Sequence, residues 1–228
     1  MAQRAAGRDG WRRRLYLPAY TTVEAARFAQ TKPNTVAYWY YGRGKRTGPA
    51  LGEKRRYAPL SYLQLVEVAF AASFRQRGVS LQRIRKARDY VAKVFQAEFP
   101  FTQYEFKTEG LHVLLDAAGV DPDFRDLIVA DEDGQMAWER IVLERFDQFD
   151  YEEDVALRWH PRGRGTPIII DPRISFGAPI LESTGTPTWV LKGRIEAGET
   201  AEEIEADFGV AQADLRYALE FEDVKVAA

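Results

Sequence analysis

The chain has 228 residues, with 32 lysines and arginines, 34 aspartates and glutamates, and no cysteine. The lack of cysteine excludes disulfides, thiolate metal sites and cysteine nucleophiles. No apolar run approaches the roughly 18 residues of a transmembrane helix. The first residues, MAQRAAGRDGWRRR, are basic but lack an apolar h-region, which argues against a secretory signal. We therefore expect a cytoplasmic protein.

The net charge of −2 hides a strong polarity along the chain. Residues 1–98 contain 20 lysines and arginines against 6 aspartates and glutamates, a net charge of +14. Residues 99–228 contain 12 against 28, a net charge of −16. A basic half suits a phosphate backbone, because neutralised phosphates release counterions and add affinity. The same backbone would repel the acidic half, which we expect to face another partner.

A helix-turn-helix pattern lies in the basic half. Thr21–Glu24 has the spacing of a capping box, which predicts a helix over residues 22–29. Pro33 suits the first turn of a second helix over residues 33–41, because its missing N–H is not needed there. Two short helices joined by a tight turn form a helix-turn-helix. We expect the following apolar side chains to be buried: Val23, Ala26, Phe28, Val36 and Trp39.

A β-hairpin wing is predicted next, from two basic segments with glycines in and between them, Gly42–Gly48 and Glu53–Tyr57. A second capping box, formed by Ser61 and Gln64, opens a long helix to about Arg77. The buried stripe of this helix is expected to contain Leu65, Val66, Ala69 and Phe70. The next helix is predicted from Ser80 to about Ala97, with Leu81, Ile84, Ala87, Val91 and Phe95 at helical spacing. Its first turns carry four basic residues that form either a DNA-facing or a solvated surface: Arg83, Arg85, Lys86 and Arg88.

Three motifs in this region carry a family resemblance. They are Tyr-Thr-x-x-Glu-x-Ala from Tyr20, Arg-x-Tyr at Arg55–Tyr57, and Gly-Val-Ser-Leu-x-x-Ile at Gly78–Ile84. Over roughly residues 18–95 the chain resembles the DNA-binding domain of the MerR family of winged-helix regulators. It departs from that pattern in a longer wing and in Ala37–Tyr41, where the family often has Arg-Tyr-Tyr. The resemblance implies binding to double-stranded DNA as a homodimer.

The predicted DNA contacts follow from this layout. Thr21 and Thr22 stand at a helix N-terminus, which favours a phosphate. The second helix is expected to face the major groove, where an asparagine can read an adenine edge, through Lys32, Asn34, Thr35 and Tyr38. The wing is expected to contact the backbone or the minor groove through Arg43, Lys45, Arg46, Lys54, Arg55, Arg56 and Tyr57. The arginines of the N-terminal arm either add phosphate contacts or belong to a disordered leader: Arg12, Arg13 and Arg14.

The middle of the chain predicts strands and an acidic loop. Strands are expected over Thr102–Lys107 and Leu111–Leu115, and the acidic, turn-rich residues 116–137 contain a short apolar element at Phe124–Ala130. The segment Trp138–Phe149 fits either an amphipathic helix or a strand. A hairpin is predicted between Val155–Trp159 and Pro167–Ile170.

A second resemblance covers about residues 167–222. Its motifs are Asp171–Ile180, Gly185–Thr188, Ala197–Ile204 and Asp214–Leu219. These motifs resemble a small domain of formerly unknown function found in VapB-like antitoxins of bacterial toxin–antitoxin pairs. The resemblance implies a toxin partner, a PIN-domain ribonuclease.

The same region predicts three helices. They are expected over Thr188–Ala197, over Thr200–Asp207 under a third capping box, and from about Gln212. The predicted core consists of Leu191, Ile195, Ile204, Phe208, Val210, Leu215 and Leu219. From Glu199 to Ala228 nine carboxylates face two basic residues, a net charge of −7. This charge favours a protein partner, either the toxin or the sister protomer, over DNA.

Enzymatic functions find little support. The two histidines, His112 and His160, lie in different segments. The acidic clusters Asp131–Asp133 and Glu152–Asp154 have the ligand type of a divalent-cation site, but a solvated acidic loop is the default interpretation of both. The glycine run Gly42–Gly48 lacks the Ser or Thr of a P-loop. We expect no enzyme, no cofactor and no metal site.

The sequence thus predicts an α+β chain. Its segments are a basic flexible arm over 1–17, a winged helix-turn-helix with a following helix over 18–98, an acidic middle region with strands over 99–166, and a trihelical domain over 167–228. We expect an antitoxin that binds and represses its own promoter and neutralises its toxin through the acidic half. The alternative is a MerR-type regulator that senses a small molecule in residues 99–166, through aromatics that otherwise form an ordinary core: Phe99, Phe101, Tyr104, Phe106, Trp138 and Trp159.

Overall fold

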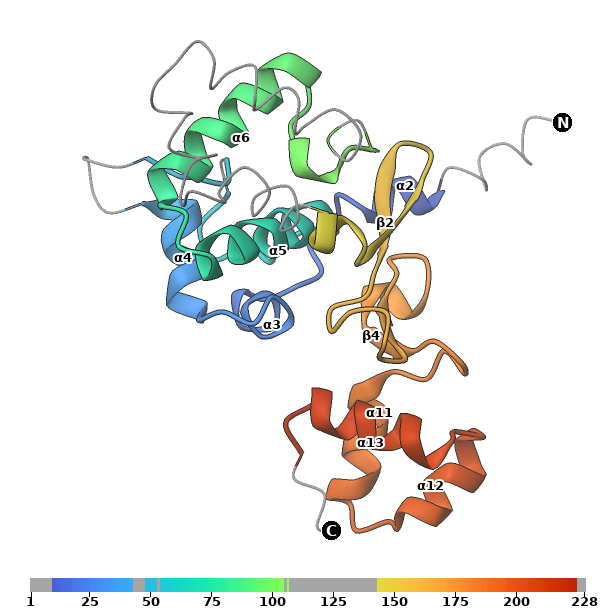
Figure 1. Ribbon diagram of the computed structural model, residues 1–228. Coiled ribbons are helices and arrows are strands. Elements are labelled where there is room, and N and C mark those ends of the chain that lie inside the picture. Colours follow the sequence, from blue (N-terminus) through green and yellow to red (C-terminus); the bar gives the residue numbers. More distant parts are fainter. Residues whose placement is uncertain (1–9, 43–47, 53, 105, 107–142, 225–228) are drawn as a thin grey trace, which may run out of the picture. The chain divides into compact units, whose positions relative to one another are not determined.

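The computed structural model describes residues 10–42, 48–52, 54–104, 106 and 143–224. They form helices and a small four-stranded sheet, an α+β fold as predicted (Figure 1). The described residues pack as two compact units. Among the described residues, the first unit contains those within 15–147 and 151–156, and the second contains those within 10–14, 148–150 and 157–224.

The first unit is built on helices whose starts lie where the sequence placed them. Its elements are α3 (Thr22–Phe28), α4 (Pro33–Tyr41), α5 (Tyr62–Gln76), α6 (Leu81–Phe95) and the 3₁₀ turn η2 (Pro100–Thr102). Both predicted capping boxes form: the hydroxyl oxygens of Thr21 and Ser61 accept the N–H groups of Glu24 and Gln64 at 3.1 and 3.3 Å. Pro33 occupies the first turn of α4, as predicted.

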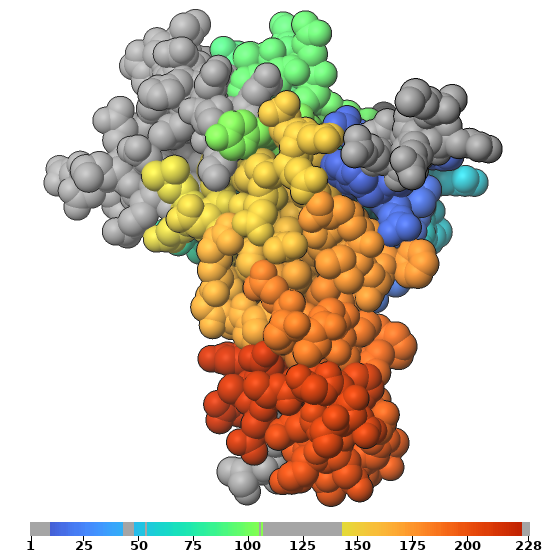
Figure 2. All heavy atoms as spheres, turned by 90° about the vertical axis from the view of Figure 1, so that its right-hand side faces the viewer, coloured from blue at the N-terminus to red at the C-terminus, as the bar shows by residue number. Residues whose placement is uncertain are grey.

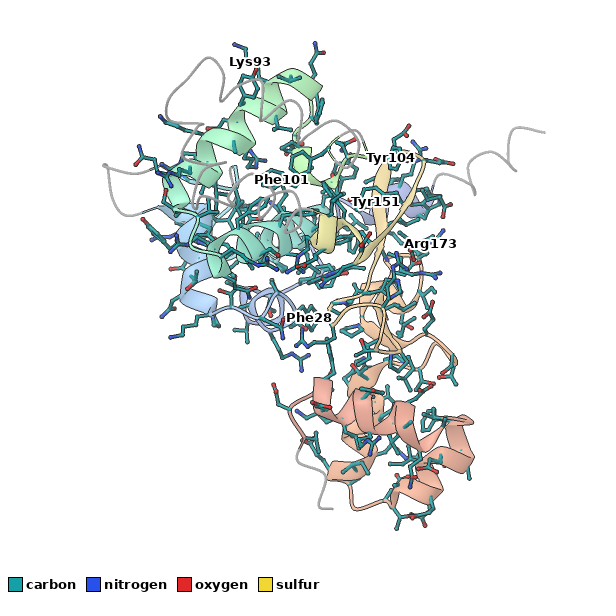
Figure 3. All side chains as sticks on the ribbon, in the orientation of Figure 1. Phe28, Lys93, Phe101, Tyr104, Tyr151 and Arg173 are labelled. Atoms are coloured by element: carbon teal, nitrogen blue, oxygen red, sulfur yellow. The ribbon has the colours of Figure 1, made fainter. Side chains whose placement is uncertain are left out.

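An aromatic core surrounds α5, nearly all of whose residues are buried. Phe70 lies at its centre, with its ring centroid 5.2 Å from that of Phe146 and 5.8 Å from that of Phe101. The rings of Tyr104 and Tyr151, both labelled in Figure 3, meet edge to face, with centroids 5.6 Å apart. Edge-to-face and tilted ring pairs of this kind add to the stabilisation from burial alone.

A buried ion pair connects α5, α6 and the segment that follows α6. The Arg88 guanidinium donates to Glu67 Oε2 at 2.6 Å and to the Glu98 carbonyl at 2.5 Å. The Phe101 N–H donates to the other Glu67 oxygen at 2.9 Å. Burial raises the pKa of Glu67, and the Arg88 charge and these hydrogen bonds only partly offset that rise. Each oxygen of the buried Glu67 carboxylate thus accepts a hydrogen bond from a group of the same unit.

Several expectations for the first unit were wrong. Val23 is 62% exposed instead of buried. The strand expected over Thr102–Lys107 does not form where the structure describes it, because Thr102 ends η2 and Gln103 makes only an isolated bridge with Val155. Residues 143–146 are helical, which favours the helix alternative at that end. The expected elements Leu111–Leu115 and Phe124–Ala130 lie outside the described residues.

The second unit contains the helix α2 (Gly10–Arg14) and most of the sheet. The strands are β1 (Phe149–Glu152), β2 (Val155–Trp159), β3 (Ile168–Ile170) and β4 (Pro179–Leu181), in that order across the sheet. The predicted hairpin is confirmed, since Trp159 pairs with Ile170 in antiparallel register. The sequence missed β4, which pairs with β3. Residues 10–14 of the predicted flexible arm are helical.

Three helices complete the second unit and form one cluster in Figure 2: α11 (Thr188–Glu196), α12 (Ala201–Phe208) and α13 (Gln212–Phe221). The third capping box is confirmed, with Thr200 and Glu203 bonded in both directions. Gly209 ends α12 in the left-handed conformation with φ 62°. Of the predicted core, Leu191, Ile204, Val210, Leu215 and Leu219 are buried. Ile195 and Phe208 are half-buried.

Candidate DNA-binding surface

The helices α3 and α4 separate an apolar inner face from a polar outer face. Val36, Trp39 and Tyr40 of α4 are at most 3% exposed and pack inward with Ala25, Ala26 and Phe28 of α3. Asn34 is exposed, and Thr35 and Tyr38, one and four positions further on, are half-exposed. Because residues four apart share a helix face, these three polar side chains form one outward surface. Lys32, at the start of α4, is exposed beside it.

The turn between the two helices is held by the backbone. Gln30 takes the left-handed conformation with φ 53°, and the Thr31 N–H donates to the Ala26 carbonyl at 2.8 Å. This is a Schellman end, which normally uses glycine at the left-handed position. It fixes the direction in which the chain enters α4.

Thr21 has a role in the fold that competes with phosphate binding. Its hydroxyl accepts the Glu24 N–H and donates to Glu24 Oε2 at 2.7 Å, and its own N–H donates to that oxygen at 2.8 Å. The Glu24 carboxylate thus already stands at the positive end of α3. Thr22 is half-exposed in the first turn. The phosphate contacts of both threonines stay predictions.

The loop between α4 and α5 is pinned to the helices. The N–H groups of Ala50 and Leu51 both donate to the Trp39 carbonyl, at 2.6 and 3.3 Å. Arg85 of α6 donates to the carbonyls of Gly48 and Pro49 at 2.6 and 2.9 Å. The described part of this loop, residues 48–52 and 54–57, contains no strand, so the expected β-hairpin is not seen there. Three predicted wing contacts lie outside the described residues: Arg43, Lys45 and Arg46.

A tight turn at the end of the loop presents the other wing residues. The Ala58 N–H donates to the Arg55 carbonyl at 3.1 Å, and Tyr57 has φ 63°. Arg55 and Arg56 are exposed, Tyr57 is 90% exposed, and the Arg56 guanidinium lies 5.8 Å from the Tyr57 ring centroid. These three side chains, which we call the arginine turn, are accessible to a ligand.

Two cations that the sequence associated with DNA hold the fold together instead. The Lys54 ammonium donates to the Tyr41 hydroxyl at 3.1 Å and to the Ala58 carbonyl. Arg88 is the buried partner of Glu67, so it does not belong to a basic surface. The spacing gave a signal for Arg88, because it lies four positions after the buried Ile84 on the apolar side of its helix.

The acidic side chains of the C-terminal helices are less available than their number indicates. Glu199 and Asp207 both pair with Arg194, and Glu203 caps α12, where the hydrogen bonds from Thr200 lower its pKa. Glu222 is 5% exposed and accepts from the Thr188 hydroxyl at 2.6 Å. The acidic surface that remains exposed includes Glu202, Glu220 and Asp223.

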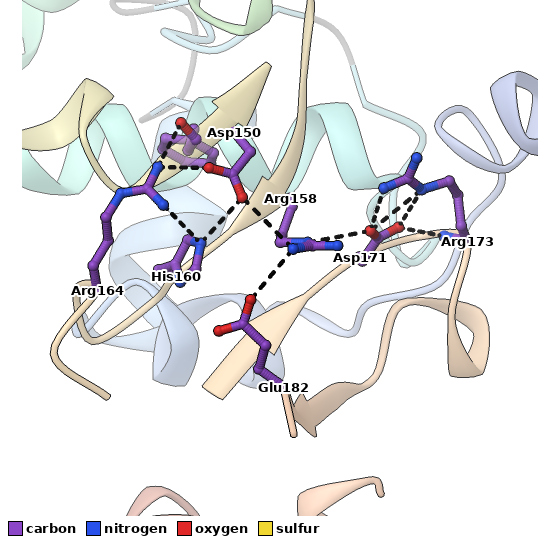
Figure 4. A network of polar contacts seen from close by, with 8 residues as sticks. Asp150, Arg158, His160, Arg164, Asp171, Arg173 and Glu182 are labelled. Atoms are coloured by element: carbon purple, nitrogen blue, oxygen red, sulfur yellow. Dashed lines mark hydrogen bonds and ion pairs between the residues drawn. The ribbon is translucent and has the colours of Figure 1, made fainter. Parts of the chain in front are cut away.

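His160 belongs to a polar network of the sheet (Figure 4). Its Nε2 atom lies 3.3 Å from Asp150 Oδ2 and 3.3 Å from Arg164 Nη1, and Arg164 also donates to Asp150 Oδ1 at 2.6 Å. Arg158 bridges three carboxylates, those of Asp150 at 3.9 Å, Asp171 at 3.6 Å and Glu182 at 3.3 Å. Burial would raise the pKa of Asp150, but the hydrogen bonds and charges of Arg164 and His160 lower it. The arrangement is that of a structural ion-pair network.

The described aromatics of the alternative ligand pocket divide between the two units. Phe99, Phe101 and Phe106 are buried in the first unit, whereas Trp159 stacks on Phe149 in the second unit with centroids 5.7 Å apart. Trp138 lies outside the described residues. The core interpretation therefore holds for the buried phenylalanines.

The described ranges contain neither a cluster of metal-ligating side chains nor a helix suited to span a membrane. There, no three side chains of the metal-ligating types come together. Glu153 and Asp154 of one predicted acidic cluster form the turn of the β1–β2 hairpin, both with positive φ, and Asp131–Asp133 lies outside these ranges. None of the described helices has the length and hydropathy that a membrane crossing requires.

Known proteins resemble this chain along most of its length. The Mycobacterium tuberculosis protein named "Putative antitoxin VapB45" is 27% identical over 228 residues, which cover 91% of this chain and 95% of the relative. The X-ray crystal structure of Rv2018 from Mycobacterium tuberculosis matches with a TM-score of 0.75 and 26% identity, over 90% of this chain and 99% of that one. Residues 168–221 match the family model "Protein of unknown function (DUF433)". The similarity to the first relative supports the role of a VapB-like antitoxin.

Proposed function

We propose that this chain is an antitoxin that represses its own promoter and neutralises a PIN-domain ribonuclease toxin. The antitoxin role rests on the similarity to a relative of that name over 91% of the chain. DNA binding rests on one structural observation. The helix α4 presents a polar outer face, and the same helix anchors the loop that carries the arginine turn, through hydrogen bonds at Trp39 and Tyr41.

The promoter would be bound by the first unit. Asn34, Thr35 and Tyr38 would meet base edges in the major groove, as the second helix of a helix-turn-helix does, while Lys32 contacts a phosphate. The arginine turn would lie on the backbone or in the minor groove, in the position of a wing. Two protomers would bind together, and Arg43, Lys45 and Arg46 complete the proposed contacts.

The toxin would be bound by residues 99–228. PIN-domain ribonucleases bind RNA, so their substrate-binding surface is positively charged. The exposed carboxylates of the C-terminal helices, which include Glu202, Glu220 and Asp223, would compete with RNA for that surface. An antitoxin bound there blocks substrate without any chemistry of its own.

Co-expression with the neighbouring toxin gene tests this function. We expect the toxin alone to stop growth, and the full chain to restore growth and to co-purify with the toxin. A variant with Glu202→Gln, Glu220→Gln and Asp223→Asn should restore growth less well. The control neutralises two exposed carboxylates of the first unit instead, Asp89→Asn and Glu98→Gln, and should restore growth like the parent. A toxin that stays fully active beside the folded chain would contradict the proposal.

A further inference from the structure

The second unit presents a phenylalanine on a strained turn. Ser175, Phe176 and Gly177 follow one another with φ of 46°, 55° and 79°, a conformation that side chains with a Cβ rarely adopt. Phe176 is 84% exposed, so its ring gains little burial to offset the strain. Backbone strain of this kind persists where the fold holds a side chain ready for a ligand.

The support beneath this ring is rigid. The buried Asp171 carboxylate accepts the Arg173 backbone N–H at 2.9 Å and the Arg173 guanidinium at 2.8 Å (Figure 4). The Gly177 N–H donates to the Ile174 carbonyl at 2.8 Å, which closes the turn. The ring is therefore presented by a pre-organised turn.

One arginine of the N-terminal helix α2, Arg14, lies beside the ring. Arg14 Nη1 donates to the Arg173 carbonyl at 3.1 Å, and the Arg14 guanidinium lies 5.7 Å from the Phe176 ring centroid. Arg12 and Arg13 are exposed in the same short helix. We call these five side chains the arginine–phenylalanine patch. The carboxylate next to them, Asp171, is buried and already bound to Arg173.

We propose that the arginine–phenylalanine patch binds single-stranded nucleic acid. The guanidiniums match phosphate oxygens in charge and geometry, and Phe176 stacks on an unpaired base, as exposed rings among basic side chains do. A duplex covers the faces of its bases and can use only the arginines. The inference goes beyond the proposed function, because this patch belongs to the second unit and the promoter-binding residues belong to the first.

Binding to an oligothymidine of twelve nucleotides tests the patch. The full chain would carry Arg55→Ala and Arg56→Ala throughout, to weaken the proposed site of the first unit. Fluorescence anisotropy should show about tenfold weaker binding for Phe176→Ala, and no change on an abasic strand of equal length. Arg13→Gln with Arg14→Gln should weaken binding to both strands. Trp189→Ala, which removes a 60% exposed ring of the same unit outside the patch, should change neither.

Photo-cross-linking locates the contact. A strand with 5-iodouracil should cross-link at Phe176, within the tryptic peptide 174–192. Cross-links confined to other peptides, or unchanged oligothymidine binding by Phe176→Ala, would overturn the proposal. It would also be overturned if Phe176→Ala lost toxin co-purification but kept nucleic-acid binding, because the patch would then be a protein interface.

A glycine variant separates binding from folding. Phe176→Gly should raise the Tm, because glycine tolerates this backbone conformation, and should bind as weakly as Phe176→Ala. If Phe176→Gly lowered the Tm, Phe176 would be a residue that supports the fold, and the proposal would fail.

Discussion

Replacing Arg55 and Arg56 with alanine tests whether the arginine turn contacts DNA. Both side chains are exposed at the end of a loop that is anchored elsewhere, by Lys54 and by the backbone at Ala50 and Leu51. We therefore expect the double variant to keep its fold and to lose two phosphate contacts. Each neutralised phosphate contributes about 0.9 to the slope of log K against log salt, so the slope should fall by about 1.8. When the salt concentration falls from about 200 to 50 mM, the ratio of the parent's DNA affinity to that of the variant should therefore rise about twelvefold.

The assay is fluorescence anisotropy on a labelled promoter duplex and on a scrambled duplex. Because phosphate contacts carry no sequence information, both duplexes should lose affinity equally. The matched control is Arg75→Ala with Arg77→Ala, which removes two exposed arginines from the end of α5 in the same unit. These arginines bond to the Val79 carbonyl and to Glu144 and should leave the slope unchanged. An unaltered slope in the Arg55/Arg56 variant, or an equal fall in the control, would refute the proposed position of the turn.

Three further predictions concern stability and are measured by thermal or denaturant unfolding. Glu67→Gln should cost about 3–5 kcal/mol, because it leaves the buried Arg88 charge without its counter-ion, whereas replacing both Glu67 and Arg88 with methionine should cost far less. The pKa of Asp150 is lowered in the folded state, so its charged form stabilises the fold above the pKa of an unfolded aspartate, about 4. This stabilisation should be lost as the pH falls through the lower folded pKa. The variant Asp150→Asn should lack that part of the pH dependence of the free energy of unfolding. Thr188→Val should cost about 1–3 kcal/mol, because Glu222 loses its buried hydrogen-bond donor.

The sequence predicted the local features of the fold well. The helix starts at Thr21, Ser61 and Thr200 follow from capping boxes, whose partners lie three residues apart and need no distant contact. The β2–β3 hairpin follows from two apolar runs around a glycine-rich turn. The α4 face of Asn34 and Tyr38 follows from helical periodicity.

Other features depend on contacts between distant residues. The strand β4 has three residues, all buried, and begins with a proline, so it shows no alternation of polar and apolar side chains. The sequence around Lys54 does not distinguish it from a DNA-binding lysine, because its bonds to the Tyr41 hydroxyl and the Ala58 carbonyl exist only in the folded chain. The left-handed Gln30 could not be predicted either, because glycine is the usual residue there.

The net charge of a sequence segment therefore differs from the charge exposed on the surface of the folded unit. Residues 1–98 are basic, but two of their cations are bound inside the first unit, at Lys54 and Arg88, and the arginines of α2 lie in the second unit. Residues 99–228 are acidic, but several carboxylates of their C-terminal helices cap or bind side chains of that unit. Each unit nevertheless presents exposed cationic side chains among its described residues, in the arginine turn and in the arginine–phenylalanine patch. The acidity of residues 99–228 thus does not prevent the second unit from binding a polyanion. Electrostatic attraction depends on the exposed charges near the ligand and only weakly on net charge at a distance.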